Sequence, residues 1–224
     1  MEMVTSTPNV PVAAMNTDAS VLSSVRSWFH DHLAREDGRL GRPYGRQAIC
    51  PFAAESLDRG AVKIVVVREE INDCDELIRI CQSHTYQEFE GVSRPSLESM
   101  VLVFPDLTSH LWHWLDETYK RLKDDFVQRH IMIAQFYPTC DVRSVHNPLF
   151  VVGTSPYPLI AVRRMMPHDI LFLADKKAWF EVFAAKFGHL MVEEGNTFPQ
   201  KVLTAYREAA AKHLPASTTS ACTE

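Results

Sequence analysis

The chain has 224 residues, of which 46% are hydrophobic and 23% are charged, and its formal net charge is −5. This composition is typical of a globular protein with enough residues for a real core. The negative balance argues against a nucleic-acid-binding domain. No apolar run approaches the roughly 20 residues that a membrane helix needs. We therefore expect neither a nucleic acid nor a membrane as a partner.

The cysteines are odd in number and form no CxxC pair, which argues against a disulfide framework or a structural zinc site. The N-terminus lacks the basic start and the apolar centre of a signal peptide. Both observations favour a cytoplasmic protein with reduced thiols. The cysteines are Cys50, Cys74, Cys81, Cys140 and Cys222.

Polar composition at both ends predicts a flexible leader over residues 1–17 and a disordered tail over residues 215–224. Residues 18–214 are expected to form a single globular domain. Its first predicted helix starts at Asp18 or Ser20 and ends near residues 37–38, where a glycine-containing loop follows up to Cys50.

A short helix is predicted over 53–57, followed by the clearest strand, 62–67, which is β-branched and apolar and is therefore expected at the centre of the sheet. Helices are predicted over 73–90 and from residue 106 or 109 to about 128. Further strands are predicted over 99–104, 131–136, 149–152 and 159–162.

The C-terminal third predicts a helix after residue 167, another over 176–187 that Gly188 would stop, and a last one from Pro199. The fold class is thus α/β or α+β, with a mixed sheet of about five strands flanked by helices.

His110, His113 and Glu117 share one face of a predicted helix and superficially suggest a metal site. The apolar stripe that includes Leu115 and Leu122 lies on the opposite face, so we interpret the three polar residues as solvated. Cys74 and Cys81 lie among apolar residues and are predicted to be core or near-core thiols.

Cys50 lies between a basic loop and the dipeptide Pro51-Phe52. The proline favours an extended backbone at Cys50, and the loop arginines Arg42 and Arg46 would stabilise a thiolate. The thiol is a candidate nucleophile, redox group or axial haem ligand. The alternative is a buried structural cysteine.

His146 opens a His-Asn-Pro turn and is a candidate metal ligand or acid/base; the alternative is a residue that stabilises the loop. Arg163 and Arg164 follow an apolar strand, and alternation sends their side chains to opposite faces. An inward arginine needs an anion partner. The candidate partners are a substrate carboxylate, a haem propionate, or the carboxylate of Asp169 or Glu55 within an ion pair.

Taken together, several motifs resemble a bacterial domain of unknown function that occurs in secondary-metabolite clusters. The resemblance spans about residues 20–190. The motifs are Cys50-Pro51-Phe52, Val103-Phe104-Pro105, the run from Met132 to Pro138, the run from His146 to Phe150, and the run from Ser155 to Asp169.

That domain is distantly similar to the YqcI/YcgG-like haem proteins, some of which oxidise the nitrogen of amino acids, and to the haem protein of cycloserine biosynthesis. The resemblance implies haem b, with Cys50 or His146 as the axial ligand and Phe52 beside the cofactor. It also implies Arg163 or Arg164 near an anionic group. Where a histidine is expected after Gln135-Phe136, this chain has Tyr137, which would ligate iron only as a phenolate.

The leading hypothesis is therefore a haem-dependent oxidoreductase of secondary metabolite or antibiotic biosynthesis. It would oxidise nitrogen in a small amino-acid-like metabolite, or convert an N-hydroxy-guanidine or amine, with a redox partner as a candidate interactor. One alternative is a cofactor-free enzyme with Cys50 as nucleophile and His146 as base. The other is a non-catalytic small-molecule binding protein.

Overall fold

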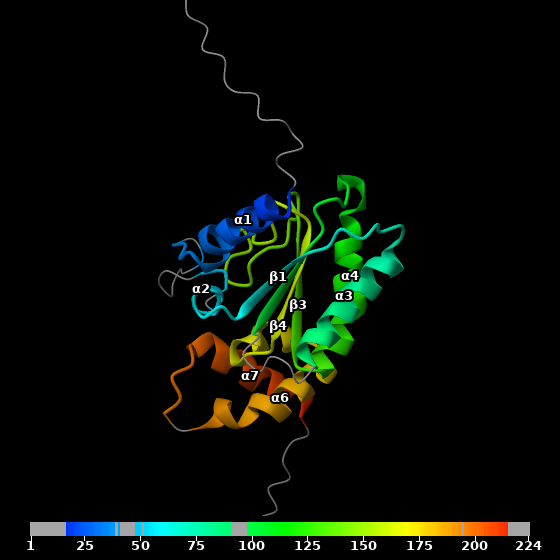
Figure 1. The fold of residues 1–224 in the computed structure, drawn as a ribbon. Helices are drawn as coiled ribbons and strands as arrows, with labels where there is room; N and C mark the ends of the chain where they lie inside the picture. The colour runs from blue at the N-terminus through cyan, green and yellow to red at the C-terminus, as the bar shows by residue number, and fades with distance from the viewer. Residues whose placement is uncertain are drawn as a thin grey trace, which may run out of the picture. The chain divides into compact units, whose positions relative to one another are not determined.

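The computed structural model describes residues 17–38, 40, 48–50, 52–90, 98–193 and 195–214. The fold is α+β, as predicted: helices flank a single mixed sheet (Figure 1). Most of the basic loop before Cys50, including Arg42 and Arg46, lies outside the described residues, as do the predicted leader up to residue 16 and the predicted tail.

The sheet has the strand order β1-β2-β4-β3. Its strands are β1 (Val62–Val66), β2 (Ser99–Val103), β3 (Ile131–Phe136) and β4 (Leu159–Arg164). Strands β1 and β2 are parallel, with Val62 opposite Ser99. The Phe104 N–H donates to the Pro158 carbonyl at 2.9 Å, so the end of β2 meets the start of β4 and these two strands run antiparallel.

Two predictions about the sheet were wrong. The segment 149–152 forms no strand, because the Phe150 N–H bonds to the Asn147 carbonyl in a turn and only an isolated bridge joins Arg143 to Val151. Within the described residues the sheet therefore has four strands rather than five. Strand β1 lies at an edge rather than at the centre, and its residues are half-buried throughout.

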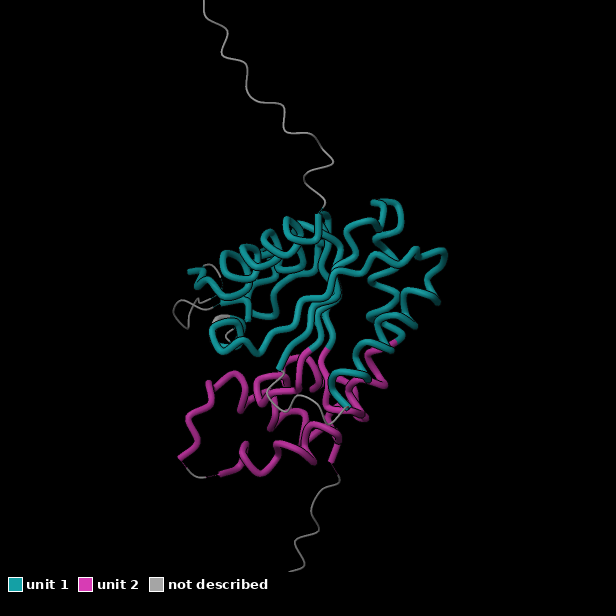
Figure 2. The backbone as a smooth tube through the Cα atoms, viewed as in Figure 1, with its two compact units in different colours: residues 1–121, 133–162 teal, residues 122–132, 163–224 magenta. Residues whose placement is uncertain are grey.

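The chain divides into two compact units, coloured in Figure 2: residues 1–121 with 133–162, and residues 122–132 with 163–224. In the first unit, α1 (Asp18–Trp28) and α2 (Ala53–Asp58) cover one face of the sheet (Figure 1). The helix α3 (Cys74–Phe89) and the start of α4 (His113–Gln128), which follows the 3-10 turn Ser109–Leu111, lie on the other face.

Helix α1 forms because Val21, Val25 and Trp28 recur at helical spacing on one buried face. The Thr17 side chain accepts the Ser20 N–H at 3.3 Å and caps the N-terminus. The chain then continues without a break into a π-helical turn, η2 (Phe29–Ala34). π-helical turns are rare in proteins, and many of those that do occur lie at functional sites.

The second unit contains the end of α4, the 3-10 turn η4 (Pro167–Asp169) and the helices α5 (Ile170–Leu173), α6 (Lys177–Val192) and α7 (Gln200–His213). Its core includes Phe180, Phe183, Val202 and Tyr206, all buried.

The prediction that Gly188 stops a helix was wrong, because α6 runs through it to Val192. A Cβ atom at position 188 would come within 2.9 Å of the Tyr206 hydroxyl oxygen. The glycine therefore permits the close approach of Tyr206 on α7 rather than ending α6.

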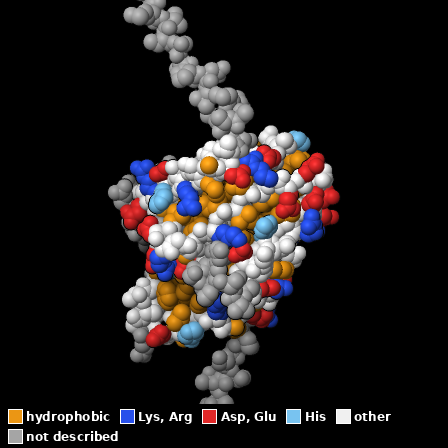
Figure 3. Space-filling model, in the orientation of Figure 1, with side chains coloured by type: hydrophobic (Ala, Val, Ile, Leu, Met, Phe, Trp, Pro, Cys, Tyr) orange, Lys and Arg blue, Asp and Glu red, His pale blue; other side chains and the backbone are white. Residues whose placement is uncertain are grey.

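On the face shown in Figure 3, acidic and basic side chains are interspersed, with hydrophobic side chains visible between them. Across the described part of the chain, no helix is both long enough and apolar enough to cross a membrane.

Candidate functional site

Cys50 lies immediately before α2 in the first unit. Its N–H donates to the Leu33 carbonyl of η2 at 2.9 Å, and its own carbonyl accepts the Ala53 N–H at 3.1 Å. The thiol is free and half-buried, and it packs against the apolar cluster that contains Trp28, Phe29 and Phe136. The backbone of Cys50 is therefore fixed from both sides. Phe52, also half-buried, precedes the first residue of α2.

The segment that carries His146 is held against the same π-helical turn. The Trp28 indole N–H donates to the Thr154 carbonyl at 2.8 Å, and His32 Nε2 lies 3.2 Å from the Val152 carbonyl. Residues 152–154 belong to the connection 137–158 between β3 and β4. The structure thus attaches the Cys50 segment and this connection to successive residues, Leu33 and His32, of one turn.

His146 is half-buried within that connection, and its N–H donates to Ser144 Oγ at 3.0 Å. The chain folds back around it, because the Ser144 N–H bonds to the Phe150 carbonyl at 2.9 Å. Leu149 at the tip is 87% exposed. Long connections with few regular hydrogen bonds are where binding residues concentrate.

A hydrogen-bonded cluster that sequence reasoning missed lies where β3 ends. Asp116, in the first turn of α4, accepts the Tyr137 hydroxyl at 2.8 Å and the Gln135 amide at 3.0 Å. The Trp112 ring lies 6.0 Å from the Tyr137 ring. The two oxygens of one carboxylate thus hold both side chains, and Asp116 fixes the orientation of the Tyr137 hydroxyl.

Burial, together with the hydrogen bond to Asp116, raises the pKa of Tyr137 well above its usual value. Tyr137 is therefore a protonated donor, and the phenolate that iron ligation would need is disfavoured beside a carboxylate. Cys140, three residues on, is 1% exposed, and burial raises the pKa of its thiol. Buried thiols of this kind are inert.

A signal for Asp116 was present in the sequence. A helix followed directly by a strand that packs against it places the start of the helix near the end of that strand. Asp116 in the first turn of α4 and Tyr137 after β3 fit that relation. The pattern of apolar residues shows which helix face is buried, but it does not say which polar residues meet.

In the second unit, Arg163 forms an ion pair with Asp169, with distances of 2.7 and 2.6 Å to the two carboxylate oxygens. Asp169 is 1% exposed and also accepts the Met166 N–H at 2.7 Å. The ion-pair alternative for Arg163 is thus the arrangement observed. Arg164, the next residue, is exposed, as alternation along a strand predicts.

Lys123 is a further buried charge that the sequence did not reveal. It is 3% exposed, and its ammonium lies 3.9 Å from the Met132 sulfur. Burial lowers the pKa of Lys123 to about 8, while the Asp169 carboxylate opposes that shift. Buried lysines are rare because removing an ammonium from water is costly.

The interpretation of His110, His113 and Glu117 as a solvated face is confirmed: all three are exposed, while Leu115 and Leu122 are buried. Among the described residues, no three or more His, Cys, Asp or Glu side chains are grouped so as to hold a metal ion. Haem differs from such sites, because its iron is held with as little as one protein side chain.

The first unit is thus an α+β structure with Cys50 on the side of α1 and α2 and the Asp116–Tyr137 pair on the side of α4. A family model described as a domain of unknown function, DUF6875, matches residues 22–197, so the chain belongs to that family. No curated protein and no solved structure matches the chain.

Proposed function

We propose that this protein is a haem-dependent enzyme that acts on nitrogen in a small amino-acid-like metabolite, with Cys50 as the axial ligand. The observation that carries the proposal is the setting of Cys50: a free, half-buried thiol, fixed at its backbone and packed against aromatic residues. The resemblance of Cys50-Pro51-Phe52 to the cysteine near a proline and phenylalanine in the YqcI/YcgG-like haem proteins supports it.

The residues around Cys50 fit a porphyrin in part. Trp28, Phe29 and Phe136 make the surroundings of Cys50 apolar and aromatic, but they are buried against one another: the Trp28 ring centroid lies 5.9 Å from that of Phe29 and 5.1 Å from that of Phe136. A macrocycle would have to displace part of this packing. Cys50 supplies a soft ligand, and His146 is the second candidate ligand. When bound, haem supplies the oxygen and electron-transfer chemistry.

Arg163 and Arg164, which the sequence predicts near an anionic group, belong to the second unit, where Arg163 is paired with Asp169 and Arg164 is exposed. An anion bound by Arg164 is tested separately from the Cys50 ligand. Asp116 and Tyr137, joined by a hydrogen bond of 2.8 Å between their oxygens, lie on the α4 side of the sheet and take no part in this proposal, because Cys50 packs on the side of α1 and α2.

The test is an absorption spectrum of protein purified from haem-supplemented cells, recorded again after reduction and addition of carbon monoxide. A Soret band with a strongly red-shifted carbonyl band supports ligation by Cys50, and an unshifted carbonyl band supports His146. Protein that takes up no haem, even with iron and precursor supplied, refutes the proposal.

Matched variants assign the ligand. Cys50→Ser should lose the shifted carbonyl band, whereas Cys74→Ser, which alters another half-buried free thiol, should keep it. His146→Gln is compared with His84→Gln, a half-buried histidine on α3. Colourless protein whose activity depends on Cys50 and His146 would instead indicate the cysteine-nucleophile enzyme. Colourless protein without turnover would indicate a binding protein.

A further inference from the structure

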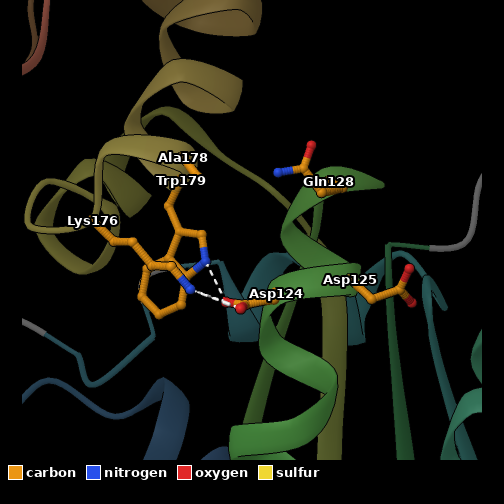
Figure 4. A pocket seen from close by; sticks show the side chains of 6 residues that line it. All are labelled: Asp124, Asp125, Gln128, Lys176, Ala178 and Trp179. Atoms are coloured by element: carbon orange, nitrogen blue, oxygen red, sulfur yellow. Dashed lines mark hydrogen bonds and ion pairs between the residues drawn. The ribbon is translucent and has the colours of Figure 1, made fainter.

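A pocket of about 390 Å³ lies between the end of α4 and the start of α6, wholly within the second unit (Figure 4). It is a shallow surface site, because four of the six residues that line it are exposed. The pocket is lined by Asp124, Asp125, Gln128, Lys176, Ala178 and Trp179. It shares no residue with the proposed haem site, since Cys50 and His146 belong to the first unit.

One side of the pocket combines an aromatic ring with a carboxylate. The Trp179 indole N–H donates to Asp124 Oδ1 at 2.8 Å, and the Lys176 ammonium lies 2.6 and 2.7 Å from the two Asp124 oxygens. Figure 4 shows the Lys176 side chain beside the indole. Its ammonium is 4.9 Å from the ring centroid.

These contacts are the ones by which proteins recognise ammonium groups: a ring face within about 6 Å and a carboxylate in hydrogen-bonding distance. The ring also lies 5.6 Å from the Lys123 ammonium, so two cations already contact it. Hydrogen bonds from Lys176 and Trp179 hold the pKa of Asp124 below its usual range, so the carboxylate is ionised at neutral pH.

We propose that this pocket binds small alkylammonium compounds, and that the Lys176 ammonium occupies the ammonium position when no ligand is bound. Lys176 is a replaceable occupant, because its side chain is 47% exposed and that of Asp124 is 64% exposed. Exposed ion pairs of this kind are weak. Gln128, exposed at the rim, offers an amide to a polar group at the far end of the ligand.

The test follows the indole N–H resonance of Trp179 by NMR, assigned with Trp179→Phe, while n-butylammonium chloride is added. Sodium chloride at the same ionic strength controls for the added salt, and 1-butanol controls for the alkyl chain without its charge. We expect a saturable shift with the amine alone. Lys176→Gln should tighten binding by up to about fivefold, since the exposed competing ion pair is removed.

Lys177→Gln is the matched control, because Lys177 is the adjacent exposed lysine and pairs with Glu181 at 3.7 Å instead of lining the pocket. It should leave the amine affinity unchanged, and Asp124→Asn should abolish binding. Should Asp124→Asn not fold, the comparison of the two lysine variants decides.

The proposal is overturned if neither the wild type nor Lys176→Gln shows a saturable shift with butylammonium. An equal response to 1-butanol, or equal affinity in the two lysine variants, does so too. Binding of N-acetyl-lysine methylamide without binding of butylammonium would overturn the small-molecule assignment in favour of a lysine side chain from a protein partner.

Discussion

Replacing Asp169 by asparagine should strongly destabilise the second unit. The substitution preserves the shape of the side chain and one oxygen that can still accept the Met166 N–H. It removes the negative charge that holds the Arg163 guanidinium through two short contacts. It also removes the charge that favours the ammonium form of Lys123.

The expected size of the effect follows from burial. Asp169 is 1% exposed and the Arg163 side chain 24%, so the guanidinium would be left in a largely dry site without its partner. Removing one partner of a buried ion pair typically costs about 3 to 5 kcal/mol. For a chain of this size, that corresponds to a fall in the melting temperature of roughly 6 to 20 °C.

Urea unfolding followed by circular dichroism measures the change. Asp175→Asn, an exposed acid in the same unit, is the matched control and should change stability by no more than about 0.5 kcal/mol. The double variant Arg163→Met with Asp169→Asn should lose less than Asp169→Asn alone, because no guanidinium is left without its partner and the amide oxygen can still accept the Met166 N–H. A loss below about 1 kcal/mol in Asp169→Asn would refute this account of the pair.

Three further predictions concern Lys123, Gly153 and Tyr137. The pKa of Lys123 is about 8 in the folded chain and 10.5 in its ordinary state, so between these pH values the unfolded chain binds more protons than the folded one. As the pH rises from about 8 to 10.5, the free energy of unfolding of the wild type should therefore increase by about 3 kcal/mol relative to that of Lys123→Met. Urea unfolding of both proteins at the two ends of the window tests this, and a constant difference contradicts it. Gly153→Ala should cost about 1 to 3 kcal/mol, because the new Cβ would overlap the Cys140 sulfur; Cys140→Ala should restore much of that loss in thermal melts, and no rescue would place the strain elsewhere. Tyr137→Phe removes the donor to Asp116 and should cost about 1 to 2 kcal/mol, with an unchanged melting temperature as the contrary result.

Local patterns predicted the elements well where one face is continuously buried. The spacing of Val21, Val25 and Trp28 predicts α1, and the apolar stripe of α4 predicts its exposed histidine face. These predictions depend on nearby residues alone, and burial of one helix face is a local property.

Predictions failed where the partner of a segment decides its structure. The apolar composition of β1 does not reveal that it lies at an edge, although its residues are only half-buried while most of those in the neighbouring strand β2 are buried. Residues 149–152 have strand-like composition, but the turn at Asn147 leaves them a single bridge to Arg143.

The candidate site divides in the same way. Local sequence predicts that Cys50 precedes a short helix, that His146 lies in a turn-rich connection, and that whichever of Arg163 and Arg164 points inward needs an anion. The packing of distant segments makes Arg163 the inward arginine and Asp169 its anion, brings Asp116 to Tyr137, and buries Lys123. The physical reason is that buried polar side chains form their hydrogen bonds and ion pairs with residues far away in the sequence. Which residues come within bonding distance is set by the packing of whole elements and not by a local pattern.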